Sequence, residues 1–370
     1  MSTGQIEIQL IAAIVAAACA LPGSFLVLRK MAMMSDAISH AILPGIVVGF
    51  FLTNDLASPV LILAAAATGL LTVFLVETLM TTRLVKEDAA IGLVFPILFS
   101  IGVILIARFA GDVHLDTDAV LLGELAFAPF DRFVIFGSDL GPRSLYVMGG
   151  VGLLNGLFIA LFYKELKVAT FDAGLAAALG FAPALIHYGL MTLVSVTAVA
   201  AFDAVGSILV VALMIGPPAA AYLLTDRLDR MIGLSVLLGV VSALGGFWVA
   251  NALDASIAGA MAGMVGVVFA VVYLAAPRYG ILAGLRRRRR QKWAFAEKML
   301  AIHLFQHEGL PEAAVENRFE HLEEHLNWSG DFARRVVRKA QQDGLLRRED
   351  GLLELTGRGR SLATEAIVAT

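Results

Sequence analysis

The first three quarters of the chain consist mainly of long apolar runs. A helix needs roughly 20 apolar residues to cross a bilayer. Runs of this kind occupy nine stretches: 8–28, 37–52, 56–76, 89–107, 145–163, 184–202, 204–224, 231–253 and 255–276. The second run is short, and only Asp203 separates the sixth from the seventh, which predicts a tight hairpin or a broken helix there. The pattern therefore predicts an all-α polytopic membrane protein with eight or nine transmembrane helices.

After residue 284 the pattern changes to shorter amphipathic segments. Arginines occupy positions 286–290, and the periodicity that follows predicts three helices, at 293–307, 311–325 and 331–343. Two short apolar segments then flank Glu349-Asp350-Gly351, which is a turn signal, and a last helix follows Gly357. Three helices and a two-stranded hairpin are typical of a winged helix-turn-helix. We therefore expect a transmembrane domain (1–284), a basic linker (285–292) and a small winged-helix domain (293–370).

The composition agrees with this division. Hydrophobic residues make up 59% of the 370 positions and charged residues only 16%, whereas soluble domains carry about 25% charged residues. Of the 59 charged side chains, 29 lie in residues 285–370. The first part is therefore predicted to lie in lipid and the second in water. The formal net charge of −3 is too small to indicate a partner.

The placement of lysine and arginine predicts which loops face the cytoplasm. Basic residues gather in five places: Arg29-Lys30, 83–86, 164–167, 227–230 and 286–290. Segment 111–139 instead carries six acidic side chains and one arginine, and is predicted to be external. Nine crossings put the N-terminus outside, whereas eight put it inside and require one re-entrant segment. The C-terminal domain is cytoplasmic in both cases.

Asp36 and His40 form the most informative pair of polar residues within the apolar part. They are four residues apart, so a helix places them on one face, about one turn from each other. A carboxylate beside an imidazole suits divalent manganese, iron or zinc better than calcium or magnesium. Ionisable groups in membrane helices are costly, which favours a functional role. In the alternative interpretation, Asp36 caps the helix and His40 packs against its neighbours.

Short motifs recur at the ends of the apolar runs. They are Leu28-Arg29-Lys30-Met31-Ala32, Ser35-Asp36-Ala37-Ile38-Ser39-His40-Ala41, Asp88-Ala89-Ala90-Ile91-Gly92, Asp112-Val113-His114-Leu115-Asp116-Thr117-Asp118 with Leu122-Gly123-Glu124, Thr170-Phe171-Asp172 with Ala178-Leu179-Gly180, and Phe202-Asp203-Ala204-Val205-Gly206 with Gly216-Pro217-Pro218-Ala219. In order and spacing, they resemble the permease subunits of the manganese/zinc/iron family of ABC importers over residues 8–280.

The resemblance implies a type II-like ABC importer permease in a bacterial plasma (inner) membrane. It implies that Asp36 and His40 coordinate a divalent metal ion within the translocation path. The expected cargo is Mn²⁺, with Zn²⁺ or Fe²⁺ next, and no permanently bound cofactor is expected. The implied partners are an ABC ATPase subunit, an extracytoplasmic metal-binding protein, and a second copy or a paralogous permease.

Three further acidic or histidine positions have two interpretations each. His114 and Asp116, within the string 112–118, guide incoming metal or belong to a solvated loop surface. Asp203 lines the path or caps a helix end.

Residues Phe171, Asp172 and Gly180 follow the basic segment 164–167. The resemblance implies that this segment is the coupling helix that docks into the ATPase. The alternative is an interfacial helix that rests on lipid headgroups. The chain contains no Gly-x-x-x-x-Gly-Lys-Ser/Thr motif for cradling phosphates. It is therefore predicted not to be an enzyme, and ATP hydrolysis is assigned to a partner subunit.

The C-terminal part departs from the family pattern, because most of these permeases end near the last crossing. It resembles the winged helix of metal-dependent, DtxR-type repressors, on segments 301–303, 334–346 and 355–359. The basic helix 331–343 permits phosphate contacts with DNA, but tethering to a membrane favours protein contacts instead. The arginines at 286–290 are expected to lie on anionic headgroups.

Four of the seven histidines lie in this part, as two i,i+4 pairs: His303 with His307, and His321 with His325. They predict a tail metal site that senses cytosolic metal; the alternative is surface histidines on amphipathic helices. Two other functions stay open for the whole chain. In one, the bundle only anchors a metal-responsive regulator, and in the other the protein is an ion-coupled metal carrier.

Overall fold

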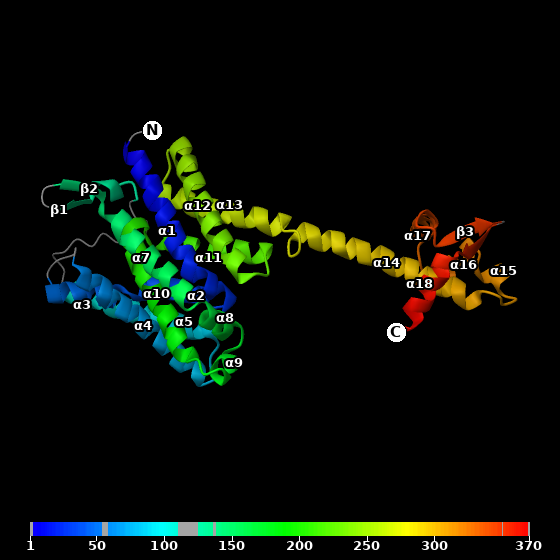
Figure 1. Ribbon diagram of the computed structural model, residues 1–370, viewed down its shortest axis with the longest axis horizontal. Coiled ribbons are helices and arrows are strands. Elements are labelled where there is room, and N and C mark those ends of the chain that lie inside the picture. Colours follow the sequence, from blue (N-terminus) through cyan, green and yellow to red (C-terminus); the bar gives the residue numbers. More distant parts are fainter. Residues whose placement is uncertain (1–2, 54–57, 110–124, 136–137, 350, 369–370) are drawn as a thin grey trace. The chain divides into compact units, whose positions relative to one another are not determined.

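The computed structural model describes residues 3–53, 58–109, 125–135, 138–349 and 351–368. The chain divides into two compact units, Met1–Gly280 and Ile281–Thr370. Each unit has a hydrophobic core of its own. Figure 1 labels most of the helices and strands of both units.

The first unit is a bundle of helices: α1 (Thr3–Leu28), α2 (Ala32–Ala41), α3 (Leu43–Thr53), α4 (Pro59–Thr81), α5 (Glu87–Phe109), α7 (Arg143–Leu161), α8 (Tyr163–Phe171), α9 (Ala173–Ala178), α10 (Pro183–Val205), α11 (Ser207–Leu224), α12 (Leu228–Leu253) and α13 (Ile257–Ala275). Within the described residues, nine segments are long and apolar enough to cross a membrane, and α2 and α3 together form one of them. The predicted polytopic helical bundle is confirmed.

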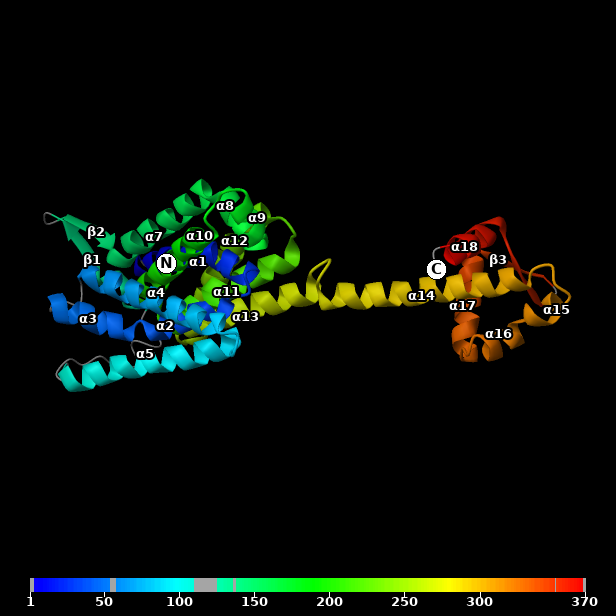
Figure 2. The same cartoon turned by 90° about the horizontal axis from the view of Figure 1, so that it is seen from below.

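Helix α1 lies in the middle of this bundle and packs against α7, α10, α11 and α12. Helices α3, α4 and α5 lie side by side in both views (Figures 1 and 2). Buried polar groups join distant segments: Asn155 Nδ2 of α7 donates to Ala18 O at 3.0 Å and to Thr197 Oγ1 at 2.8 Å. In an apolar interior such hydrogen bonds fix the register of neighbouring helices, because an unpaired amide is costly there.

The boundary between the sixth and seventh spans lies at Gly206. The predicted tight junction between these spans is confirmed, but it lies three residues after Asp203, because α10 continues to Val205 and α11 begins at Ser207. Gly206 has φ +79° and ψ 163°, a conformation that only glycine adopts without strain. Asp203 therefore lies in the last turn of α10.

A short hairpin, which the apolar pattern did not predict, precedes α7. After the 3₁₀ turn η1 (Ala128–Phe130), strands β1 (Arg132–Ile135) and β2 (Ser138–Pro142) pair antiparallel. Arg132 bonds Asp139 across the hairpin and reaches Glu7 of α1 at 2.9 Å. The hydrogen bond from Arg132 lowers the pKa of Asp139. The ion pair between Arg132 and Glu7 therefore connects the hairpin to the start of α1.

The second unit contains α14 (Ile281–His307), α15 (Ala313–Glu316), α16 (Phe319–His325), α17 (Gly330–Gln342), β3 (Leu346–Glu349), β4 (Leu352–Leu355) and α18 (Gly357–Val368). Residues 285–292, predicted as a linker, are part of α14. The core of the second unit joins α14, α16, α17, both strands and α18 through residues such as Leu300, Leu322 and Val336. Lys339 of α17 bonds Glu297 of α14, which raises the pKa of Lys339.

The prediction of a single helix over 311–325 is wrong. The chain breaks between α15 and α16, where Arg318 forms an isolated bridge with Leu352. Leu353 N also donates to Asn317 O at 3.0 Å. These main-chain bonds to β4 compete with the bonds that would continue the helix, and periodicity alone does not reveal them.

Candidate metal pathway and coupling surface

Asp36 and His40 face one another on α2, as their spacing predicts. The distance from His40 Nε2 to Asp36 Oδ1 is 3.5 Å, and their side chains are 31% and 41% exposed, respectively. The His40 ring also packs 5.9 Å from the ring of Phe95. Both side chains therefore remain accessible, although α2 lies against α4, α5, α10 and α11.

The transmembrane segment that carries this pair is broken directly after it. Helix α2 ends at Ala41, Ile42 is in a turn, and α3 begins at Leu43. Pro44 has no N–H, so it cannot donate the helical hydrogen bond to the carbonyl oxygen of His40. Broken helices with freed carbonyl groups are tolerated within a membrane where they line a cavity.

A cavity of about 740 Å³ opens beside this break. Its lining includes His40, Asp203, Asp131 and Arg143, together with mainly apolar residues of α3, α5 and α10. Asp36 itself is not part of the lining. The fold therefore brings the predicted residues His40 and Asp203 to one cavity, although 163 positions separate them in the sequence.

The predicted residues His114 and Asp116, with the rest of the string 112–118, lie outside the residues that the structure describes. Of the acidic segment predicted to be external, Asp131 and Asp139 are described. Asp131 lines the cavity, whereas Asp139 pairs with Arg132 in the hairpin at 2.8 Å.

A polar network that sequence reasoning missed joins α1, α4, α8 and α10. His187 lies at its centre: its Nε2 contacts Glu77, and its Nδ1 lies 2.9 Å from Arg29 Nη1. Arg29 Nε donates to Thr170 Oγ1 on α8 at 3.2 Å, and Tyr188 OH donates to Glu77 at 2.8 Å. A signal was present in the sequence, since Glu77 directly follows one apolar run and His187 lies inside another, and both are ionisable. Their partners are only revealed by the packing of the helices.

The segment predicted for coupling forms two short helices, α8 and α9 (Figure 1). Asp172 separates them and caps α9, accepting a hydrogen bond from Leu175 N at 2.8 Å. Gly180 follows α9 with φ +85°, the left-handed conformation that commonly ends a helix. Three apolar side chains on this segment are largely exposed: Phe171 (64%), Leu175 (49%) and Leu179 (58%).

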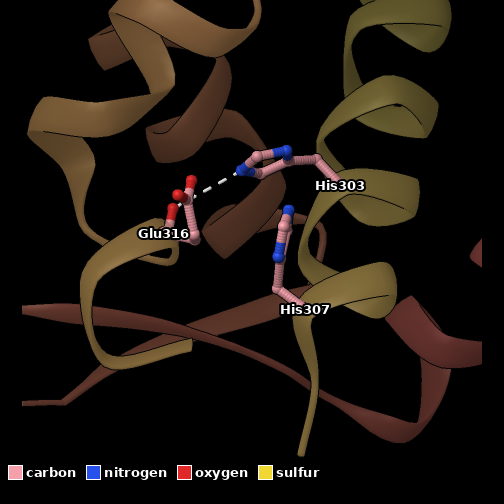
Figure 3. Close-up of side chains that lie close together, drawn as sticks. All are labelled: His303, His307 and Glu316. Atoms are coloured by element: carbon pink, nitrogen blue, oxygen red, sulfur yellow. Dashed lines mark hydrogen bonds between the residues drawn. The ribbon is translucent and has the colours of Figure 1, made fainter. Parts of the chain in front are cut away.

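The four predicted histidines of the C-terminal unit come together. His303 and His307 on α14 face Glu316 at the end of α15 (Figure 3). On α16, His321 and His325 form a second group with the same carboxylate. His303 is buried, which lowers the pKa of its imidazole. Glu316 was not predicted, because nothing in the sequence distinguishes it from its acidic neighbours.

Comparison with known proteins agrees with the helical bundle. Residues 6–277 match the ABC 3 transport family. The zinc transport system membrane protein TroD of Treponema pallidum is 52% identical over 359 residues, which are 96% of this chain and 97% of that protein. The manganese transport system membrane protein MntD of Bacillus subtilis is 49% identical over 269 residues, 73% of this chain and 91% of that protein.

A solved structure shows the same relationship. PsaBC from Streptococcus pneumoniae, in complex with Fab, is 29% identical, with a TM-score of 0.62 over 75% of this chain and 94% of that chain. The family match covers nearly the whole first unit, and two relatives are about half identical over it. The chain therefore belongs to the ABC 3 transport family.

Proposed function

We propose that this protein is the permease subunit of an ABC importer for a divalent transition metal, with Mn²⁺ as the preferred ion and Zn²⁺ or Fe²⁺ next. The observation that carries the proposal is the accessible Asp36–His40 pair, which lies just before the break in its transmembrane segment, where His40 lines a cavity. The names of the relatives, manganese and zinc transport system membrane proteins, support it.

The geometry of the pair suits a passing ion. A carboxylate oxygen and an imidazole nitrogen that are 3.5 Å apart can both lie about 2.1 Å from one metal ion. Because α2 supplies only two protein ligands, the other coordination positions of the metal ion are free for water or for Asp203 across the cavity. A site with few ligands releases its ion readily, which transport requires and storage does not.

ATP is proposed to be hydrolysed by a separate subunit that docks on α8 and α9. The exposed side chains of Phe171, Leu175 and Leu179 supply an apolar anchor of the kind that protein interfaces bury. A contact there can move α10 through Thr170, Arg29 and His187, which connect α8 to α1 and α10.

The other parts of the assembly are proposed from the chain's family and charge distribution. They are an extracytoplasmic metal-binding protein, which delivers ions with the help of His114 and Asp116, and a second permease copy or paralogue. The protein is placed in a bacterial plasma membrane. Its C-terminal unit is proposed to be a cytoplasmic winged helix of DtxR type that contacts protein rather than DNA.

Uptake measurements test the site. We expect Asp36→Asn to lower uptake of radiolabelled Mn²⁺, Zn²⁺ or Fe²⁺ by at least about tenfold, because even residues that merely support metal ligands commonly cost 10–100-fold. Asp254→Asn is the matched control, since Asp254 is exposed and its left-handed conformation accepts asparagine. Equal uptake by both variants would refute the site. Uptake that survives loss of the ATPase would refute ABC coupling.

A further inference from the structure

Five side chains that can bind metal converge in the C-terminal unit. His303 and His307 are one turn apart on α14, and His321 and His325 are one turn apart on α16. The chain reverses between these helices and places Glu316, the last residue of α15, between the two pairs. The imidazoles of two helices thus share one carboxylate, that of Glu316.

The distances match those of a ligand set. In each of two groups, His303–His307–Glu316 and Glu316–His321–His325, the ligand atoms all lie within 4.8 Å of one another. Figure 3 shows both α14 imidazoles projecting toward Glu316, with His303 Nε2 at 3.4 Å from the main-chain oxygen of Glu316. On the other side, His325 Nε2 lies 3.3 Å from Glu316 Oε2.

Burial makes an ordinary surface cluster a poor explanation. His303 is only 8% exposed and the Glu316 side chain 19%. The buried Nδ1 atoms of His307 and His321 have no hydrogen-bond partner among the described residues. A buried polar atom left unpaired costs about 1–3 kcal/mol, so such atoms call for a bound group.

An ion pair does not account for the arrangement either. A single histidine beside Glu316 would complete an ion pair, yet four imidazoles gather here, with ring centroids 4.9 Å apart for His303 and His307 and 5.9 Å apart for His303 and His325. Protonated rings at these distances repel one another, whereas neutral rings offer lone pairs to a cation.

We propose that these five side chains form a binding site for a divalent transition-metal ion, with Glu316 as the ligand common to both helices. Imidazole nitrogens with one carboxylate suit Zn²⁺, and also Fe²⁺ or Mn²⁺, whereas Ca²⁺ and Mg²⁺ prefer oxygen ligands alone. The bound ion joins α14 to α16, so its occupancy sets how firmly α15 and α16 are held on α14. The site lies within the second unit and does not depend on the proposed import.

The test measures Zn²⁺ bound by the full-length protein in detergent after equilibrium dialysis. Every protein carries Asp36→Asn, which removes a ligand of the proposed pathway site, so that the bound ion reports on the C-terminal unit. We expect Glu316→Gln to bind about one ion fewer per chain than the same protein with native Glu316. Glu312→Gln is the matched control, because Glu312 is exposed and only four positions away.

His325→Gln is a second variant that separates loss of the site from a folding defect. Its side chain is 47% exposed, so the substitution should not disturb the fold. We expect it to weaken Zn²⁺ binding while leaving the unfolding temperature without metal unchanged. Zn²⁺ should raise the unfolding temperature of the Glu312→Gln protein but not that of the Glu316→Gln protein. Equal Zn²⁺ content in the Glu316→Gln and Glu312→Gln proteins would overturn the proposal, whatever the result of the uptake experiments.

Discussion

At the scale of single residues, His187 connects charges that would otherwise be isolated near the end of the bundle. Arg29 is held between His187 and Thr170, and Glu77 between His187 and Tyr188. Burial lowers the pKa of Arg29, and the charge of Glu77 opposes that shift. The imidazole accepts from Arg29 at Nδ1, so the nitrogen that faces Glu77 carries the proton.

We therefore expect His187→Phe to destabilise the protein. The phenyl ring fills similar space, but Arg29 and Glu77 each lose their contact with the imidazole, at a cost of about 1–3 kcal/mol. The unfolding temperature of the detergent-solubilised protein measures this. Tyr188→Phe is the control, because it removes a single hydrogen bond to Glu77 from a more exposed side chain. If both variants lowered the unfolding temperature by the same amount, His187 would contribute no more to the network than one hydrogen bond of Tyr188.

The Asp36–His40 pair illustrates what one residue spacing can reveal. Four positions along a helix place two side chains on one face whatever surrounds them, and the observed separation of 3.5 Å agrees. By contrast, the cavity that joins His40 to Asp203 depends on how α2, α5 and α10 pack. The sequence left Asp203 with two interpretations for this reason.

At the scale of secondary-structure elements, the apolar runs located the helices but not every break. The break after Ala41 arises from Pro44, and the joint at Gly206 from a glycine with positive φ. The break between α15 and α16 arises from pairing with β4. The first two have local causes and are visible in the sequence, whereas the third depends on a strand more than 30 positions away.

The short helices α8 and α9 form the segment on which the ATPase subunit is proposed to dock. We expect Leu175→Asp to lower metal uptake by about tenfold or more without changing the amount of protein in the membrane. A carboxylate in an apolar anchor must lose its water without gaining a partner, and buried anchors dominate interface energies. Uptake and membrane abundance are measured in the same cells.

Leu84→Asp provides the comparison for Leu175→Asp. Leu84 is 88% exposed and lies between α4 and α5, outside both helices. Its substitution should leave uptake at the wild-type level. If Leu175→Asp behaved in the same way, α9 would not be a docking element, and an interfacial helix on lipid headgroups would become the better interpretation.

At the scale of the whole molecule, the chain consists of two units with separate cores. MntD matches 73% of this chain but 91% of its own length, so its similarity is confined mainly to one unit. TroD aligns over 359 residues and so extends into the second unit. The second unit is therefore shared with TroD.

We accordingly expect a chain that ends after residue 290 to support metal uptake. This truncation keeps the first unit and the basic run at 286–290 but removes α15 to α18. The measurements are uptake and membrane abundance, compared with the full-length chain. Loss of uptake at normal abundance would contradict the independence of the two units and make the second unit a required part of the transporter.

The sequence by itself determined the polytopic bundle and the approximate places of its nine apolar segments. It also determined the change from apolar to charged composition near residue 284, and the position of Asp36 and His40 on one face of a helix. Each of these follows from hydrophobicity or helical spacing over a short window, which is a local property. Only the tertiary structure decided which distant groups meet: Arg29 with Glu77 through His187, His40 with Asp203 at one cavity, and Glu316 with two pairs of histidines. The physical reason is that helix packing brings together residues far apart in the chain, and no local pattern encodes those partners.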